Sequence, residues 1–121
     1  MNITKKYLRD NPHHIFVFGD NLLKKGYGGA AALRDEPNTY GFITKKAPNN
    51  GEWAFYKPEE YKEVFKNEIE ILEAHIKKFP SSLFLISKIG AGLANKYNIW
   101  EEVIEPNIQV LKNYSNVKFL W

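Results

Sequence analysis

The sequence predicts one α/β domain over residues 1–121, in which helices flank a central mixed, largely parallel sheet in a three-layer arrangement. Three observations lead to this fold class. Short apolar runs typical of buried strands recur along the chain, one long amphipathic pattern separates two of them, and a glycine-rich segment follows two of the runs. Because strands alternate with helical patterns, we expect a largely parallel sheet.

Four segments are expected to be strands, because each is an apolar or β-branched run bounded by turn residues. They are residues 15–18, 40–44, 83–86 and 117–121. Asn11-Pro12, a turn signal, precedes the first strand, and Gly19-Asp20-Asn21 ends it. A run of only four apolar residues suits a strand that is buried on both faces.

The longest helix is expected from Pro58 to Phe79. Proline suits the first helical turn, and Glu59 and Glu60 follow it at the end where the helix dipole favours acids. Apolar residues then recur at three- and four-residue steps, which gives the helix one apolar stripe. Pro80 ends it.

Two shorter helical segments are also expected. One runs from Gly28 to Arg34, where alanines allow close packing against a sheet. The other begins after Asn98, which we expect to be the N-cap of a capping box with Glu101. Pro106 falls inside this second pattern, so we expect a kink there, or two short helices with Pro106 starting the second.

Composition narrows the classes of function. A net charge of +3 would help to attract a phosphorylated ligand but does not resemble the basic stripe of a dedicated nucleic-acid binder. The chain has no cysteine, and therefore no disulfide and no thiolate nucleophile. Residues 1–7 do not have the apolar core expected of a signal peptide, and no run approaches the roughly 20 apolar residues that span a bilayer. We therefore expect a soluble, cytoplasmic protein with no membrane partner.

The histidines do not predict a metal site. His13 and His14 are adjacent, so on a strand they would point to opposite faces. His75 stands alone on the long predicted helix. We expect neither a metal nor a cofactor.

The two glycine-rich elements, residues 26–32 and 89–94, carry most of the functional information. A strand that ends in small residues lets bare backbone N–H groups converge, and such a nest binds anions, phosphate above all. Both elements follow strands whose carboxyl ends should meet at one edge of the sheet, where ligands bind in open α/β folds. We therefore expect one cleft that holds a ligand with two phosphates, or one diphosphate gripped from both sides.

Neither element matches a common nucleotide-binding motif. No Gly-Lys-Ser/Thr closes a Walker A loop, and neither has the Gly-x-Gly-x-x-Gly spacing of a Rossmann fingerprint. Glycine stretches also arise from tight turns and close helix–strand packing. A structural α/β domain, in which the glycines serve only packing, therefore stays open.

Three segments resemble macrodomains, the ADP-ribose-binding α/β modules. They are Phe18-Gly19-Asp20-Asn21 with the following Gly26–Ala31, then Ile43-Thr44-Lys45-Lys46, and Lys88-Ile89-Gly90-Ala91-Gly92-Leu93. The similarity is to the branch that includes terminal ADP-ribose glycohydrolases and the DNA ADP-ribosyl glycohydrolase antitoxins. Order and spacing agree from about residue 15 to residue 121, and the Ile-Gly-x-Gly-Leu element is the most specific motif.

The resemblance implies a ligand site built from all three segments. In it, the loop 90–93 would cradle the diphosphate through backbone N–H groups, and residues 28–30 would approach the distal ribose and its phosphate from the opposite side. Asn21 and Asp20 would contact that ribose. The implied ligand-binding residues are Gly19, Asp20, Asn21, Gly28, Gly29, Ala30, Thr44, Lys45, Ile89, Gly90, Ala91, Gly92 and Leu93.

Whether the protein is an enzyme stays undecided. Lys45 matches the lysine that attacks the anomeric carbon in the glycohydrolase branch, a role that needs an unprotonated amine. The branch also has an acidic residue directly after the Gly-x-Gly-Leu element, and Ala94 stands here instead. Asp20 or Asp35 could substitute, so we take Lys45 and Asp20 as candidate catalytic residues. Macrodomains also carry an earlier strand whose aspartate recognises adenine, and only a polar segment precedes Ile15 here.

Four functions follow from these observations. The first is binding of ADP-ribose or a related ribose-phosphate nucleotide; the second is removal of ADP-ribose from protein or nucleic acid through the lysine; the third is a non-enzymatic sponge for a nucleotide signal; the fourth is the structural domain. Five aromatic residues could stack on a base or cover the core: Trp53, Phe55, Tyr56, Tyr97 and Trp100. The sequence does not predict an oligomeric state.

Overall fold

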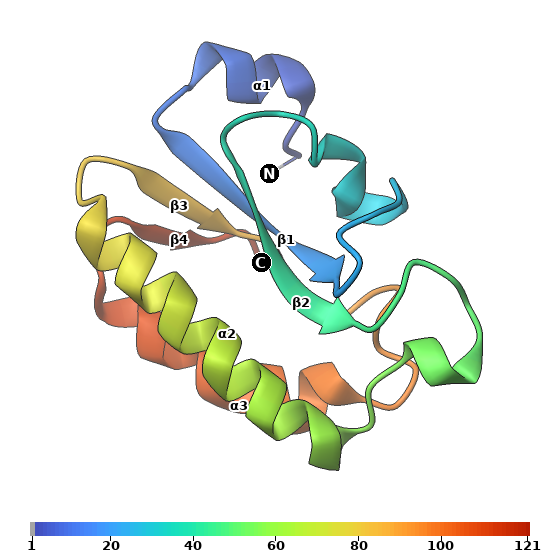
Figure 1. Ribbon diagram of the computed structural model, residues 1–121. Helices are drawn as coiled ribbons and strands as arrows, with labels where there is room; N and C mark the ends of the chain where they lie inside the picture. The colour runs from blue at the N-terminus through green and yellow to red at the C-terminus, as the bar shows by residue number, and fades with distance from the viewer. Residues whose placement is uncertain (1) are drawn as a thin grey trace.

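The computed structural model describes residues 2–121 and contains a four-stranded, parallel sheet with strand order β2-β1-β3-β4 (Figure 1). The strands are β1 (His14–Asn21), β2 (Thr39–Lys45), β3 (Leu83–Ile86) and β4 (Val117–Phe119). All four expected strands are confirmed. The expectation of a mixed sheet is wrong, since every neighbouring pair is parallel; the antiparallel pairing in the described chain is an isolated bridge between Lys45 and Phe55.

Helices cover both faces of the sheet (Figure 1). One face carries α2 (Pro58–Lys78), the π-helix η3 (Trp100–Ile104), α3 (Glu105–Ile108) and the 3₁₀ helix η4 (Gln109–Asn113). The other carries α1 (Lys5–Asp10) and the 3₁₀ helix η1 (Gly29–Leu33). Side chains alternate along β1, so Val17 joins the core under α2, whereas Phe16 and Phe18 pack with α1 and η1.

The helical segments differ from the sequence prediction in two places. The segment after Gly28 is a single 3₁₀ stretch, η1, rather than a longer helix. Asn98 is not an N-cap: it has a φ of 64°, and the N–H of Trp100 donates instead to the side chain of Asn95 at 3.0 Å. Pro106 stands in the first turn of α3, which begins at Glu105 and follows η3 directly, so the chain stays helical across the proline and changes only its helix type nearby.

Helix α1 was missing from the sequence prediction. The segment is polar, and only Leu8 of its six residues is buried, so no apolar periodicity marks it. Its start is signalled by Thr4, whose side chain accepts a hydrogen bond from the N–H of Tyr7.

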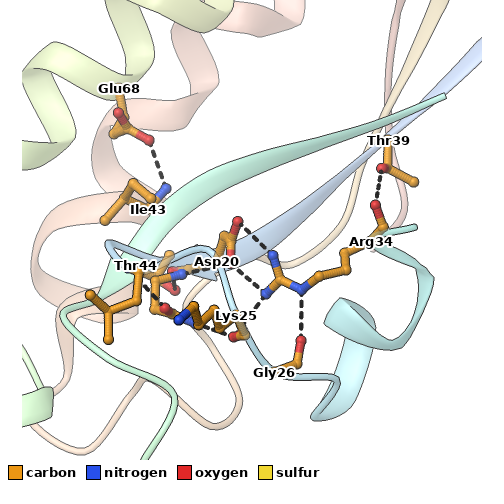
Figure 2. Close-up of polar contacts among 10 residues, drawn as sticks. Asp20, Lys25, Gly26, Arg34, Thr39, Ile43, Thr44 and Glu68 are labelled. Atoms are coloured by element: carbon orange, nitrogen blue, oxygen red, sulfur yellow. Dashed lines mark hydrogen bonds and ion pairs between the residues drawn. The ribbon is translucent and has the colours of Figure 1, made fainter. Parts of the chain in front are cut away.

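Helix α2 holds the carboxyl end of β2 in place (Figure 2). The Tyr61 hydroxyl donates to the carbonyl of Ile43. The Glu68 carboxylate accepts the N–H of Ile43 at 2.7 Å, as Figure 2 shows. β2 is an edge strand, so these contacts satisfy main-chain groups that no neighbouring strand pairs. They position the next two residues, Thr44 and Lys45, which enter the site described below.

The strand order places a topological switch point between β1 and β3. From β1 the chain crosses to β2 through η1 on one face, whereas from β3 it crosses to β4 through α3 on the other face. Connections that leave two neighbouring strands in opposite directions open a crevice at their carboxyl ends. Within residues 2–121, no helix combines the length and apolar character that a membrane crossing requires.

Candidate functional site

A cavity of about 330 Å³ opens at the carboxyl ends of β1, β2 and β3. Both glycine-rich elements line it, the first through residues 26–31 and the second through Ile89, Gly90, Gly92, Leu93 and Ala94. The prediction that the two elements share one edge of the sheet is confirmed. The cavity therefore lies where parallel sheets usually bind ligands.

Glycines allow three segments to converge around this cavity. A Cβ added at Gly19 would lie 3.1 Å from Thr44 Oγ1 and 3.6 Å from the Gly90 nitrogen, so β1, β2 and the second element meet there. Across the cavity, Leu93 Cδ1 lies 3.4 Å from the Cβ position of both Gly28 and Gly29. Leu93 thus connects the two glycine elements within the cavity lining.

Several backbone donors in the lining are free. Within residues 2–121, the N–H groups of Gly28, Gly90, Gly92 and Leu93 donate no hydrogen bond to the protein. Gly90 adopts a φ of 79°, a left-handed conformation that glycine accepts without penalty. Unpaired main-chain N–H groups around a left-handed residue form the type of concavity that binds anions.

The charged side chains in the lining also favour an anionic ligand. Three lysines contribute to the wall, Lys25, Lys45 and Lys88. Within the described chain the one carboxylate in the lining is Asp20, and both of its oxygens accept from the Arg34 guanidinium, at 2.7 and 3.2 Å. The cavity is therefore cationic and suits an anionic ligand.

Lys45 occupies the end of β2 with its amine in a partly desolvated place. Its Nζ donates to the carbonyl of Asn49 at 2.9 Å and lies 4.5 Å from the centre of the Phe55 ring. Burial lowers the pKa of the Lys45 amine below its usual value. A larger fraction of this lysine is therefore unprotonated than of a solvated one, which is what a nucleophilic amine needs.

Asp20 and Arg34 form an anchor for the first glycine element (Figure 2). Besides its ion pair with Asp20, Arg34 donates to the carbonyls of Gly26 at 2.6 Å and Lys25 at 3.1 Å. The pair is buried, with the Arg34 and Asp20 side chains 11% and 4% exposed. The Asp20 carboxylate lies over Gly41 of β2, where any Cβ would overlap it.

This arrangement corrects the sequence-based role of Asp20. A carboxylate held at both oxygens by a guanidinium cannot readily move a proton at the reacting centre, so we withdraw Asp20 as a catalytic candidate and assign it to loop positioning. Sequence reasoning missed Arg34 altogether. The pair spans 14 residues, and no local pattern signals it.

Two other predicted polar residues, Asn21 and Thr44, line the cavity, but their side chains form hydrogen bonds with main-chain groups of the protein. Asn21 donates from Nδ2 to the carbonyl of Lys25 at 2.8 Å and accepts the N–H of Leu23 at 3.1 Å. Thr44 is buried, and its hydroxyl donates to the carbonyl of Asp20 at 3.3 Å. Both side chains hold the loop that follows β1.

The remaining predicted residues divide by position. Gly19, Gly28, Gly29, Ala30, Ile89, Gly90, Gly92 and Leu93 line the cavity. Ala91 does not: it packs against the main core, and its N–H donates to the carbonyl of Lys88. Within the second element, Gly90 and Gly92 therefore face the cavity whereas Ala91, between them, packs against the core.

No free carboxylate reaches the cavity from the described residues. Ala94, where the resembling branch has its acid, is buried in the cavity wall. Asp35 accepts a hydrogen bond from the Tyr27 hydroxyl at 2.8 Å and does not contribute to the lining. Lys45 thus lacks the acidic partner that the lysine mechanism normally uses.

The fold and the cavity define the protein as a parallel α/β domain with a cationic cavity at the carboxyl edge of its sheet. The chain belongs to a family of unknown function, DUF7831, whose model matches residues 1–97. The match covers β1, β2, β3, α2 and both glycine elements. No curated protein and no solved structure matches the chain.

Proposed function

We propose that this protein binds ADP-ribose, or a related ribose-phosphate nucleotide, in the cavity between the two glycine elements. One observation carries the proposal: free backbone N–H groups from two loops and three lysines line the same cavity, whose one carboxylate in the described chain is paired with Arg34. Such a lining stabilises negative charge without a metal ion. The resemblance to macrodomains supplies the ligand class.

The diphosphate would sit against the second glycine element. There the N–H groups of Gly90, Gly92 and Leu93 would donate to phosphate oxygens, and Lys88 would add positive charge. Gly28 and Gly29 would approach the ligand from the other side, because they carry no side chain into the cavity. Hydrogen bonds to charged groups are about twice as strong as neutral ones, so even a few such donors give useful affinity.

Calorimetric titration with ADP-ribose tests this proposal when it is combined with Gly92→Val. A Cβ at Gly92 meets no atom within 4 Å and the residue's φ is not left-handed, so the valine fits the fold while it adds bulk to the cavity lining. We expect an unchanged melting temperature and loss of binding. Ala32→Val, which enlarges an exposed side chain outside the cavity, should bind normally. Equal affinity in both variants would move the site elsewhere.

Hydrolysis is the second candidate, favoured by the position and lowered pKa of Lys45. The neutral amine would attack the anomeric carbon of the distal ribose, and the bond to the acceptor protein or nucleic acid would break. The departing group would take up a proton, and water would then release the ribose from the lysine. Since the lining offers no free carboxylate, the lysine amine or water would have to supply that proton.

Incubation with ADP-ribosylated protein and ADP-ribosylated DNA distinguishes the candidates. If the protein is a hydrolase, Lys45→Ala abolishes release of ADP-ribose while Lys46→Ala keeps it, since Lys46 pairs with Glu60 outside the cavity lining. Binding without release by the native protein would identify a binder or a sponge for a nucleotide signal.

A further inference from the structure

Tyr27 is placed differently from every other aromatic side chain in the described chain: it alone lines the cavity. It stands between Gly26 and Gly28 in the first glycine element, so the residues directly before and after it have no side chain that could cover its ring. Its side chain is 58% exposed. An aromatic residue that is half open to solvent at the wall of a cationic cavity requires an explanation other than core packing.

One end of the Tyr27 side chain is fixed while its ring is free. The hydroxyl donates to the Asp35 carboxylate at 2.8 Å, and this contact raises the pKa of Tyr27. Within residues 2–121, neither an aromatic ring nor a lysine or arginine cation packs on the Tyr27 ring, although such partners occupy many other rings of the protein. The tether orients the ring and leaves a face available.

The aromatic residues that the sequence offered as stacking platforms are not available. Phe55, Tyr56 and Trp100 are buried in the core, and lysines cover the rings of Phe55 and Tyr97. Trp53 is 63% exposed but does not reach the cavity lining. Tyr27 is therefore the aromatic surface that a ligand in this cavity meets.

Apolar neighbours extend the same wall. Pro48 also lines the cavity and contacts Gly26, the residue before Tyr27. Leu93 lies against Gly28, the residue after Tyr27. A flat, weakly polar group of a ligand fits such a wall better than the phosphates do, because these are drawn to the lysines and free N–H groups.

We infer that Tyr27 is the specificity-determining residue of this site, and that it stacks on the base of the bound nucleotide. The inference rests on the proposed function and narrows its ligand to nucleotides that carry a base, as opposed to base-free sugar phosphates or diphosphate. Stacking of an aromatic side chain on a base contributes about 1–3 kcal/mol and tolerates any base, since every base has a π face. Tyr27 thus selects for a base without selecting which one.

The test compares Tyr27→Leu, which removes the ring, with Tyr27→Phe, which keeps the ring and loses only the tether to Asp35. Each is titrated with ADP-ribose and with inorganic diphosphate. We expect the leucine variant to lose about tenfold or more in ADP-ribose affinity. The phenylalanine variant should stay close to the native protein, and diphosphate affinity should not change. Trp53→Leu, an exposed aromatic outside the cavity, is the matched control.

Each outcome bears on a different claim. If the native protein binds neither ligand, the proposed function fails and this inference fails with it. If the native protein binds ADP-ribose and the leucine variant binds it as tightly as the native protein and the phenylalanine variant do, Tyr27 does not stack on the base. The proposed function then still stands. A parallel loss of ADP-ribose and diphosphate affinity in the leucine variant also overturns the inference, because the residue would then act on loop shape.

Discussion

The two glycine elements face one another across a single cavity, yet the protein holds them by different means. The first element, after β1, is fixed by polar side chains. Arg34 joins Asp20 to the carbonyls of Lys25 and Gly26, and Asn21 adds a second bond to Lys25. Little of this element is buried, because η1 rests on a hydrophobic cluster that is much smaller than the main core under α2.

The second element, after β3, is fixed by apolar packing. Ile89 and Ala94 are buried at its two ends, and a Cβ at Gly90 would overlap Ile104 and contact Ile99. This element rests on the larger core, which is formed with α2 and η3.

The difference shows that one kind of binding surface can be built on two kinds of support. Where a loop lies over a thin hydrophobic layer, charge-assisted hydrogen bonds fix its shape. Where it lies over a thick one, close packing does so, and glycine is needed because nothing larger fits. The following predictions separate the two supports, beginning with the largest expected effect.

Arg34→Leu should destabilise the protein most. It leaves the buried Asp20 carboxylate without its partner, and breaking a buried pair in this way costs about 3 kcal/mol. Urea unfolding measures the loss. Lys6→Leu breaks the exposed pair with Asp10 and should cost less than about 1 kcal/mol. Equal losses in the two variants would show that the polar anchor does not support the first element.

Gly90→Ala tests the packed element. The new Cβ would collide with Ile104 and force a left-handed conformation on alanine, so we expect a loss of about 2–3 kcal/mol in the free energy of unfolding. Gly92→Ala, two residues on, adds the same methyl group in open space and should leave stability unchanged. A neutral Gly90→Ala would contradict the role assigned to packing.

Gly41→Ala tests whether β2 belongs to the polar anchor. A methyl group there displaces the Asp20 carboxylate, and we expect a cost of about 1–2 kcal/mol. In the Arg34→Leu background the same substitution should cost less, because the carboxylate has lost the geometry that the methyl disturbs. Additive costs in this double-mutant cycle would separate Gly41 from the anchor.

Lys45 gives the smallest and most local effect. Because burial lowers its pKa, Lys45 has a larger unprotonated fraction than an ordinary lysine at any pH below the usual lysine pKa of about 10.4. Acylation followed by mass spectrometry at about pH 8–9 should therefore label Lys45 faster than Lys46, and the advantage should disappear as pH rises past that value. Slower labelling of Lys45 across the range would contradict the lowered pKa.

Sequence patterns identified much of this fold and part of the site. The strands and the long helix follow from local periodicity and proline chemistry, which neighbouring residues dictate. Helix α1 was missed because a polar helix has no apolar period, and the hydrogen bond from Trp100 to Asn95 was missed because the sequence does not show the left-handed backbone of Asn98.

The sequence by itself determined that two small-residue elements follow strands and would meet at one edge, and it singled out Lys45. Only the tertiary structure decided that Asp20 pairs with Arg34, that Ala91 turns away from the cavity and that Tyr27 lines it. The physical reason is the distance along the chain over which each interaction acts. Strand and helix periodicities are local properties of the chain, whereas ion pairing and cavity lining depend on which distant residues the completed fold brings within a few ångströms.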